Sequence, residues 1–284
     1  MKLYTTVNIQ PADLLLSHDR PIMMLGSCFT DEIGLRLIQS GFEVMCNPFG
    51  TLYNPLSIAA CLNRIMQAIP IGEDCLVFQD GLYHSWFHHG SYSSPNKNQV
   101  LTRCNASLED AVRFLERDPL LLVTLGTAFA FFLNNPSSSL NGQVVSNCHK
   151  VHPQQFIRRR ISVDEVVQAL LPFLGKYQMI MTVSPIRHLA DGLHGNQLSK
   201  ATLLMAVEQL TQHGCDYFPS YEILLDELRD YRYYSRDLCH PSDVAVDIIY
   251  ERFQQSYMSE QTRLLSIDYQ KQYRHSQHRQ IHNI

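Results

Sequence analysis

Two short segments, far apart in the chain, carry residue types that together could perform acyl transfer. The first reads Gly26-Ser27-Cys28-Phe29-Thr30 and follows a short apolar run. The second reads Asp237-Leu238-Cys239-His240-Pro241 and puts a carboxylate three residues before an imidazole. A carboxylate can orient an imidazole that acts first as general base and then as general acid. A hydroxyl or thiol activated by that base can form a covalent acyl intermediate with an ester.

The first segment has the pattern of a strand, a tight turn and a helix start. This geometry puts a side chain at a helix N-terminus, where free N–H groups and the helix dipole stabilise an anion. We expect a cysteine at this place to have a lowered pKa. The alternative is structural: Gly26 and Ser27 form a plain helix cap and Cys28 is a small core residue. For the second segment the alternative is that His240 caps the following helix.

The elements that would position both segments alternate between buried strands and amphipathic helices. Strands are expected at 21–25, 42–46, 120–125, 177–183 and 216–219. Helices are expected at 32–39, 56–68, 107–117, 162–174, 196–212 and 243–253, the third opened by a capping box at Ser107-x-x-Asp110. This alternation predicts a mostly parallel sheet covered by helices on both faces, a three-layer α/β/α sandwich. Ligands bind such sheets at the carboxyl ends of the strands.

Two stretches interrupt the alternation and are expected to be insertions above the ligand-binding edge of the sheet. The stretch 69–105 is rich in aromatic residues and histidine, and 129–145 resembles a hairpin.

His84, His88 and His89 could suggest a metal site, but no carboxylate pair or second ligand set accompanies them, so we expect no metal. Tyr231, Tyr233 and Tyr234 are interpreted as packing rather than as a sugar platform. We expect a catalytic domain at 1–255 and a polar extension at 256–284 without catalytic role.

The composition narrows the class of protein. The 284 residues include 23 Lys and Arg against 27 Asp and Glu, a net charge of −4, which argues against a nucleic-acid binder. A hydrophobic fraction of 45% and a charged fraction of 18% are typical of a globular domain. The eight cysteines form no CxxC pair, which favours free thiols in a reducing compartment. We see no secretion signal and no apolar run of membrane-spanning length, and expect a cytoplasmic protein without membrane partners.

Several motifs resemble one known family. Between about Tyr4 and Phe253 the chain is similar to the GSCFA family, described as a branch of the SGNH (GDSL-like) hydrolases. The matching motifs are Gly26–Thr30, Asn47–Thr51, Leu125–Ala128, Asn147–Lys150, Ser184–His188, Gly195–Lys200 and Asp237–Pro241. The resemblance implies a flavodoxin-like three-layer fold and an esterase, lipase or O-acyl carbohydrate esterase or transferase. It implies no cofactor for hydrolysis.

The resemblance assigns a catalytic triad but leaves the nucleophile open between neighbours. Laid without a gap on the SGNH block Gly-Asp-Ser-x-Thr/Ser, Cys28 matches the serine, and we favour this register. A shift by one residue makes Ser27 the nucleophile. Both cannot face the same histidine, because one residue on a helix turns the side chain by about 100°. Asp237 and His240 complete the triad as orienting acid and general base.

The resemblance also assigns an oxyanion hole and a substrate surface. The oxyanion hole of the group uses the nucleophile's own N–H, a glycine matched here by Gly50, and an asparagine in the third block. That asparagine is absent, because Gly126 is followed by Thr127 and Ala128. Thr127, Asn147 and His149 are candidate replacements. Asn47, His149, Lys150, Arg187 and His188 are the candidate substrate-binding residues, although an ion pair or structural network is open for several of them.

We therefore expect a hydrolase of an O-acyl ester, which could be a carbohydrate ester, acting through a covalent acyl-enzyme. The alternative is an acyltransferase that passes the acyl group to a sugar hydroxyl, with coenzyme A as a possible donor. A binding module with a decayed site is a third interpretation, disfavoured because Asp237, His240 and the turn at Cys28 are present together. The partners expected are a small-molecule or carbohydrate ester and no nucleic acid, and the sequence leaves the oligomeric state open.

Overall fold

The centre of the molecule is a parallel sheet. The computed structural model describes residues 5–281, of which 277–281 by their backbone alone. The sheet contains β1 (Ile22–Gly26), β2 (Val44–Cys46), β5 (Leu120–Leu125), β9 (Met179–Val183) and β10 (Asp216–Phe218), in the order β10-β9-β5-β1-β2. All neighbouring strands are parallel. Counted along the chain, these strands have the flavodoxin-like order 2-1-3-4-5, whose ligand site lies between its first and third strands, here β1 and β5.

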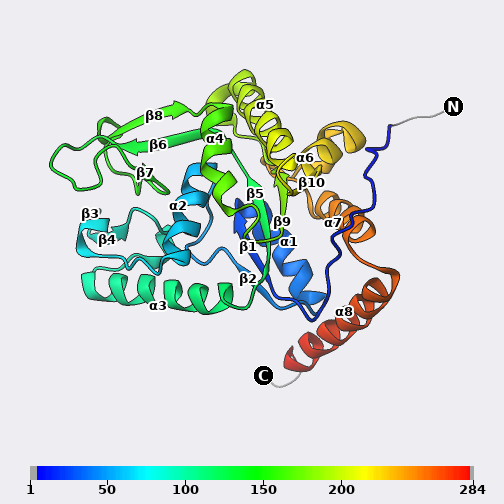
Figure 1. Cartoon of the computed structure of the whole chain (residues 1–284). Helices are drawn as coiled ribbons and strands as arrows, with labels where there is room; N and C mark the ends of the chain where they lie inside the picture. The colour runs from blue at the N-terminus through cyan, green and yellow to red at the C-terminus, as the bar shows by residue number, and fades with distance from the viewer. Residues whose placement is uncertain (1–4, 282–284) are drawn as a thin grey trace.

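Helices cover both faces of this sheet, which confirms the three-layer α/β sandwich (Figure 1). Met23 and Leu25 of β1 face the core beneath one helical layer, and Ile22 and Met24 face the core beneath the other. The first layer contains α2 (Pro55–Met66), α3 (Lys97–Leu115), α4 (Val163–Leu170) and α5 (Gly192–Thr211). The second contains α1 (Cys28–Gln39), α7 (Asp243–Tyr257) and a short helical segment at 220–228.

Side-chain caps begin α2, α3, α4 and α7, and one predicted cap is wrong. Ser162 opens α4 with a complete capping box. The third predicted helix starts ten residues earlier than expected, at Lys97, where Asn96 caps it. Ser107 therefore lies inside α3, where its hydroxyl donates to the Pro48 carbonyl. The sequence interpretation missed the first half of α3 because it assigned those residues to an insertion.

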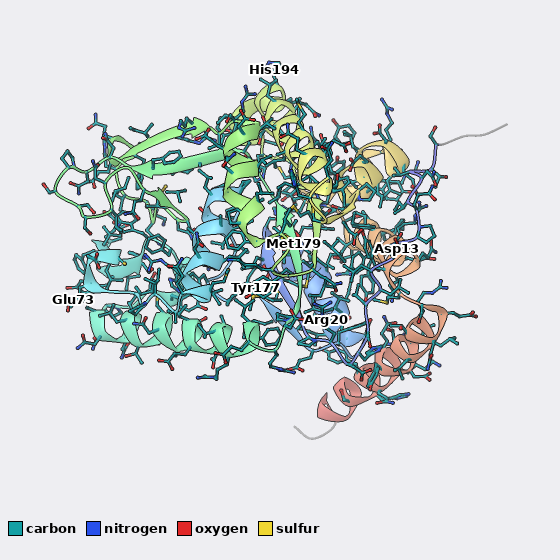
Figure 2. The ribbon with its side chains drawn as sticks, in the orientation of Figure 1. Asp13, Arg20, Glu73, Tyr177, Met179 and His194 are labelled. Carbon is teal, nitrogen blue, oxygen red and sulfur yellow. The ribbon has the colours of Figure 1, made fainter. Side chains whose placement is uncertain are left out.

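The two insertions form small antiparallel sheets beside the main sheet. One is the hairpin of β3 (Leu76–Gln79) and β4 (Leu82–Ser85). The other joins β6 (Phe129–Leu133), β7 (Val144–Val145) and β8 (Phe156–Arg160) in the order β7-β6-β8. The sequence did not predict β8, in which Arg158 lies over the Phe129 ring and Arg159 lies over the Phe132 ring of β6. In Figure 2, Met179 lies among the packed side chains at the centre, whereas Glu73 and His194 lie at the periphery.

The C-terminal segment forms α8 (Glu260–Ile281), which packs beside α1. Gln270 donates from its amide to the Ser40 hydroxyl at 2.8 Å, and the Tyr269 ring lies against Gly41. No helix within residues 5–281 is both long and apolar enough to cross a membrane. All eight cysteines lie in this part of the chain and carry free thiols.

Candidate active site

The turn after β1 is built to bring β1 close to β5. Gly26 ends β1 with φ +150°, and a Cβ atom there would lie 2.3 Å from the Thr124 carbonyl oxygen. The Gly26 N–H donates to the Asn47 side-chain oxygen at 2.8 Å, so Asn47 stabilises the turn. The chain then enters α1 at Cys28, with Ser27 at the N-cap position. The geometry places two nucleophilic residue types at the carboxyl edge of the sheet.

Only one of the two faces the imidazole. The Ser27 side chain is 1% exposed and its hydroxyl donates to the Ser184 hydroxyl at 3.2 Å. Cys28 is half-buried, and its Sγ lies 3.7 Å from Nε2 of His240. The register that makes Cys28 the candidate nucleophile therefore fits the structure. Ser27 does occupy the N-cap position, as the structural alternative expected, but without a side-chain cap, and Cys28 packs against the core on one side and borders a pocket on the other.

The imidazole is held by its neighbouring carboxylate. Nδ1 of His240 lies 2.5 Å from Oδ2 of Asp237. The other carboxylate oxygen accepts the backbone N–H groups of Cys239 and His240 at 2.9 and 3.0 Å. These N–H groups and the imidazole lower the pKa of Asp237 to about 2. A carboxylate on Nδ1 favours the tautomer whose free lone pair is on Nε2, facing Cys28. Ser242, rather than His240, caps α7.

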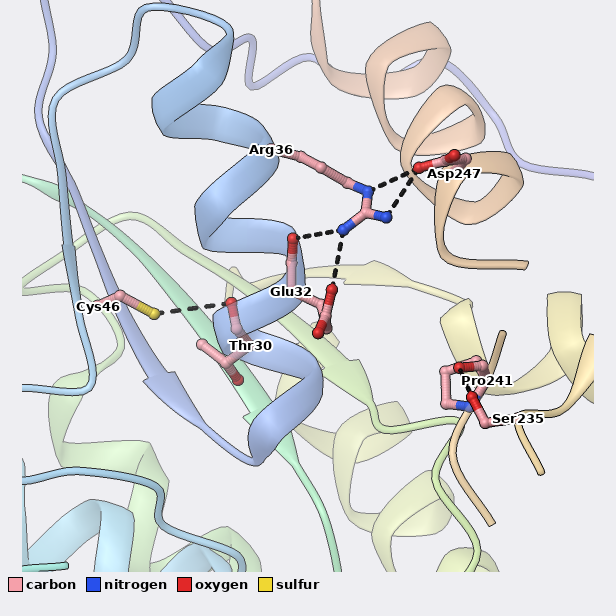
Figure 3. A network of polar contacts seen from close by, with 7 residues as sticks. All are labelled: Thr30, Glu32, Arg36, Cys46, Ser235, Pro241 and Asp247. Carbon is pink, nitrogen blue, oxygen red and sulfur yellow. Dashed lines mark hydrogen bonds and ion pairs between the residues drawn. The ribbon is translucent and has the colours of Figure 1, made fainter. Parts of the chain in front are cut away.

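Packing of α1 against α7 sets the distance between Cys28 and His240, since Cys28 begins α1 and His240 lies just before α7. The Arg36 guanidinium joins the two helices by pairing with Glu32 at 3.0 Å and with Asp247 at 2.8 Å (Figure 3). The loop before α7 is closed by a 3.1 Å hydrogen bond from the Ser235 hydroxyl to the Pro241 carbonyl.

The resting Cys28 side chain is a thiol. Burial is the main cause that raises its pKa above the usual value, and the carboxylates of Asp31 and Glu32 add to the rise. This corrects the expectation that the helix N-terminus lowers the pKa of this cysteine. The nearby anions and the buried position outweigh the helix dipole, whose effect is confined to the first turn. A reaction at this sulfur would therefore require a base to take the thiol proton, and His240 is a base within reach.

Tyr53 is a candidate site residue that the sequence interpretation missed. Its hydroxyl lies beside the Cys28 thiol and stabilises the thiolate form. The Thr51 hydroxyl donates to the Tyr53 oxygen at 3.4 Å, which leaves the phenolic proton free to be donated. Burial raises the pKa of Tyr53, so the ring is a neutral proton donor. The available signal was its place in the loop after β2, which returns to the edge that carries Cys28.

The three expected oxyanion donors are engaged elsewhere. The Gly50 N–H donates to the Asn47 carbonyl at 2.7 Å, and this glycine is required by its φ of +81° and by the contact with His89. The Thr127 N–H donates to the Tyr53 carbonyl at 2.8 Å, and its hydroxyl bonds to Ser199 at 3.0 Å. The Asn147 amide donates to the His88 carbonyl at 3.1 Å. These residues shape the loops instead. In the described part of the chain, the Cys28 N–H donates to no other residue's backbone, and its bond to the sulfur of the same residue favours the thiolate form.

A pocket of about 510 Å³ opens beside the Cys28 thiol. Tyr53, Phe129 and Phe131 give it an aromatic wall, and Arg158, paired with Asp191, lies at its polar side. Two predicted substrate-binding residues, Arg187 and His188, line it, as does Thr127. Arg187 donates to the Leu238 carbonyl at 3.1 Å and so supports the loop that carries the histidine. Burial lowers the pKa of His188 to about 4, so this imidazole is neutral near pH 7.

Comparison with protein-family models decides the family. The GSCFA family model matches residues 21–253, from the start of β1 into α7. The chain belongs to the GSCFA family. The matched region contains both the turn at Cys28 and the loop at His240, so the GSCFA region holds the complete candidate site. No curated protein matches the chain.

Other residues singled out in this GSCFA chain lie away from the thiol. Within the described residues, Asn47, His149 and Lys150 do not line either pocket that touches Cys28. His149 bonds through Nε2 to the Ser85 carbonyl at 2.8 Å and stacks on His84. Lys150 is exposed in a left-handed turn. Asn47 and His149 therefore make structural contacts, and all three remain candidate substrate residues outside the pockets beside Cys28.

The three histidines of the first insertion are likewise used in local contacts. His84 and His89 bond through Nδ1 to the hydroxyls of Ser93 and Ser91 at 2.6 and 3.1 Å. His88 bonds through Nδ1 to the Ser85 hydroxyl at 2.9 Å. No cluster of His, Cys, Asp or Glu that could hold a metal ion is found within residues 5–276, whose side chains the structure describes.

A buried lysine supports the floor of the GSCFA site. Lys200 of α5 is 0% exposed, and its Nζ donates to the carbonyls of Gly126 and Ser184, each at 2.7 Å. Those carbonyls belong to the turns that follow β5 and β9. Desolvation lowers the pKa of Lys200 to about 7. The sequence motif contained this lysine without assigning it a role, because nothing in the spacing shows which carbonyls it would reach.

Proposed function

We propose that this GSCFA family protein is an acyl-ester hydrolase that forms a covalent acyl-enzyme on Cys28. The observation that carries the proposal is the line of groups from Sγ of Cys28 through the His240 imidazole to Asp237, with distances of 3.7 and 2.5 Å. A nucleophile, a base within reach and a group that orients the base are the parts that nucleophilic acyl transfer requires.

The reaction would proceed in two halves. In the first, Sγ of Cys28 attacks the ester carbonyl while Nε2 of His240 takes the thiol proton. The tetrahedral intermediate collapses when the imidazolium returns that proton to the leaving alcohol, which gives a thioester on Cys28. In the second half, a water molecule gives a proton to His240 and attacks the thioester. The thiolate leaves, takes the proton back and releases the carboxylic acid.

The negative charge of the tetrahedral intermediate needs hydrogen-bond donors. The Cys28 N–H at the first turn of α1 and the Tyr53 hydroxyl beside the thiol are the groups suited to this role. Both are fixed by the fold before substrate binds, and preorganised donors of this kind carry a large share of catalysis. The Tyr53 hydroxyl would thus take the place of the asparagine that the third sequence block lacks.

Membership of the SGNH hydrolase group is part of this proposal. It is supported by the flavodoxin-like strand order, by a nucleophile in the turn after β1, and by an Asp-x-x-His motif just before α7. It is also supported by the position of the site at the switch between β1 and β5. The aromatic and polar lining of the large pocket suits a hydroxylated alcohol such as a sugar, because sugars combine apolar faces with hydroxyl groups.

Acyl transfer to a second alcohol is a further candidate. The observation that favours it is the identity of the nucleophile, since the thioester on Cys28 can pass its acyl group to any alcohol that reaches the site in place of water. The pocket of about 510 Å³ has room for such an acceptor. Coenzyme A is a possible acyl donor in this version.

The test is turnover of p-nitrophenyl acetate, followed by mass spectrometry of the acid-quenched protein. We expect release of p-nitrophenol and an acetyl group on the peptide that contains Cys28. His240→Ala serves as the variant without base and should lose both signals. Addition of sugars would divert acetate to acetyl sugar in a transferase. Unchanged turnover in His240→Ala, or an acetyl group on another residue, would contradict the mechanism.

A further inference from the structure

Cys28 and His240 border two pockets rather than one. The pocket of about 510 Å³ lies on the side of Tyr53 and Thr127. A second pocket of about 160 Å³ also touches Cys28 and His240 but extends between α1 and α7. Ile186 also lines both pockets, together with Cys28 and His240. A carbonyl carbon bound to Cys28 would thus have one space on each side of it.

The smaller pocket has an apolar inner wall and an acidic mouth. Phe29 of α1, Val246 of α7 and Pro241 form the apolar part, and all three are buried. Glu32 and Asp243, both exposed, lie at its outer side. Such a wall favours an aliphatic group, and the two carboxylates disfavour an anionic one by charge repulsion.

We propose that the smaller pocket is the acyl subsite and that it selects short, uncharged acyl groups. This inference rests on the proposed hydrolysis at Cys28. A cavity of about 150 Å³ is known to hold a benzene-sized molecule, so a pocket of about 160 Å³ takes an acyl chain of up to about six carbon atoms.

The order of events decides which arm of the substrate takes which pocket. The acyl group stays attached to Cys28 while the alcohol leaves and a water molecule or second alcohol enters. The leaving and entering groups must use the same space, because His240 protonates one and deprotonates the other. The pocket of about 510 Å³, called the wide pocket below, provides that passage, and its polar side with Arg158 and Asp191 matches an alcohol. The smaller pocket, called the narrow pocket below, then holds the acyl group, which stays bound to Cys28 throughout.

The test measures kcat/KM for p-nitrophenyl esters with acyl chains from two to twelve carbons, for wild type and two variants of Val246. This residue lines the narrow pocket and not the wide one. One methylene in an apolar pocket discriminates by about 10- to 200-fold. We expect at least about a tenfold fall in wild type beyond six carbons, a limit moved to longer chains in Val246→Ala, and one moved to shorter chains in Val246→Ile.

Two controls separate the subsite from general effects. Ile249→Val changes a fully buried residue of the same helix that lines neither pocket, and should keep the wild-type chain-length profile. Phe131→Leu changes the wide pocket and should alter the dependence on the alcohol while leaving the chain-length limit in place. Turnover with a limit that Val246 does not move, or that Phe131 moves, would overturn the acyl subsite and leave the hydrolysis standing. Absence of turnover with every ester would overturn both.

Discussion

The hydroxyl of Ser27 bonds to the hydroxyl of Ser184 at 3.2 Å, in the floor of the site and out of reach of substrate. This contact joins the turn after β1 to the turn after β9. Because β1 and β9 lie on either side of β5, the contact crosses the end of β5. It gives Ser27 a structural task and leaves Cys28, one residue later, as the group that faces His240.

The nucleophile is tested by a pair of neighbouring variants. Cys28→Ala removes the attacking atom, and we expect ester turnover to fall by at least about 10³-fold. Ser27→Ala removes only the contact with Ser184, and activity should stay within about tenfold of wild type. Rates with p-nitrophenyl acetate and thermal unfolding of both variants provide the measurement. A fully active Cys28→Ala would show that the register is wrong.

The carboxylate is expected to act through the imidazole. Asp237→Asn should lower kcat by about 10²- to 10⁴-fold, because the amide no longer favours the tautomer with a free Nε2. The low pKa of Asp237, about 2, keeps the carboxylate ionised across the range in which the protein is assayed. Acid titration of this group therefore should not appear in the pH profile between about pH 3.5 and 9. A profile with an inflection near pH 4 that disappears in Asp237→Asn would contradict this.

The raised pKa of Cys28 makes a prediction for alkylation. At pH 7 a smaller fraction of this thiol is ionised than of an ordinary cysteine, since burial raises its pKa above the usual value of 9.0. The rate of iodoacetamide labelling at Cys28, followed by peptide mass spectrometry, should still rise above about pH 9. Removing the nearby anion in Glu32→Gln should shift the curve to lower pH. A labelling rate that reaches its plateau near pH 6 would instead indicate a preformed thiolate.

Tyr53 should contribute to the chemical step. Tyr53→Phe removes the hydroxyl beside Cys28 and keeps the ring in the pocket wall, so we expect kcat to fall by about 10²- to 10³-fold with a small change in KM. Thr51→Val, which removes the hydroxyl that donates to Tyr53, is the matched control and should have a much weaker effect. A change confined to KM would show that Tyr53 acts in binding alone, and an equal loss of kcat in both variants would show that the effect is not specific to the Tyr53 hydroxyl.

Lys200 should make stability depend on pH. Its pKa is about 7 in the folded protein against 10.5 for an exposed lysine, so between these values the unfolded chain binds more protons. The free energy of unfolding should therefore rise from pH 7 to 8.5, by up to about 1.4 kcal/mol per pH unit. Urea unfolding of wild type and Lys200→Met measures it, and the variant should lack the rise. A similar slope in Lys200→Met would assign it to other groups.

The sheet could be predicted from the sequence because the buried strands are continuous apolar runs. Leu120–Leu125 reads as a central strand, and it pairs with β1 on one side and β9 on the other. The local capping signal at Ser162 was equally clear. The hydrophobic pattern did not predict the helix that crosses a region of mixed composition, the first half of α3. It also did not predict β8, most of whose residues are exposed.

Gly26, the adjacent serine and cysteine, and the Asp-x-x-His spacing were visible in the sequence, and they determined which chemistry to expect and at which edge of the sheet. Tertiary structure decided that Cys28 rather than Ser27 faces the His240 imidazole, and that the Tyr53 hydroxyl lies beside the Cys28 thiol. It also decided that Gly50, Thr127 and Asn147 use their donors within the loops. The reason is physical: the direction of a side chain and the partner of an N–H depend on how distant segments pack, and sequence spacing reports only local geometry.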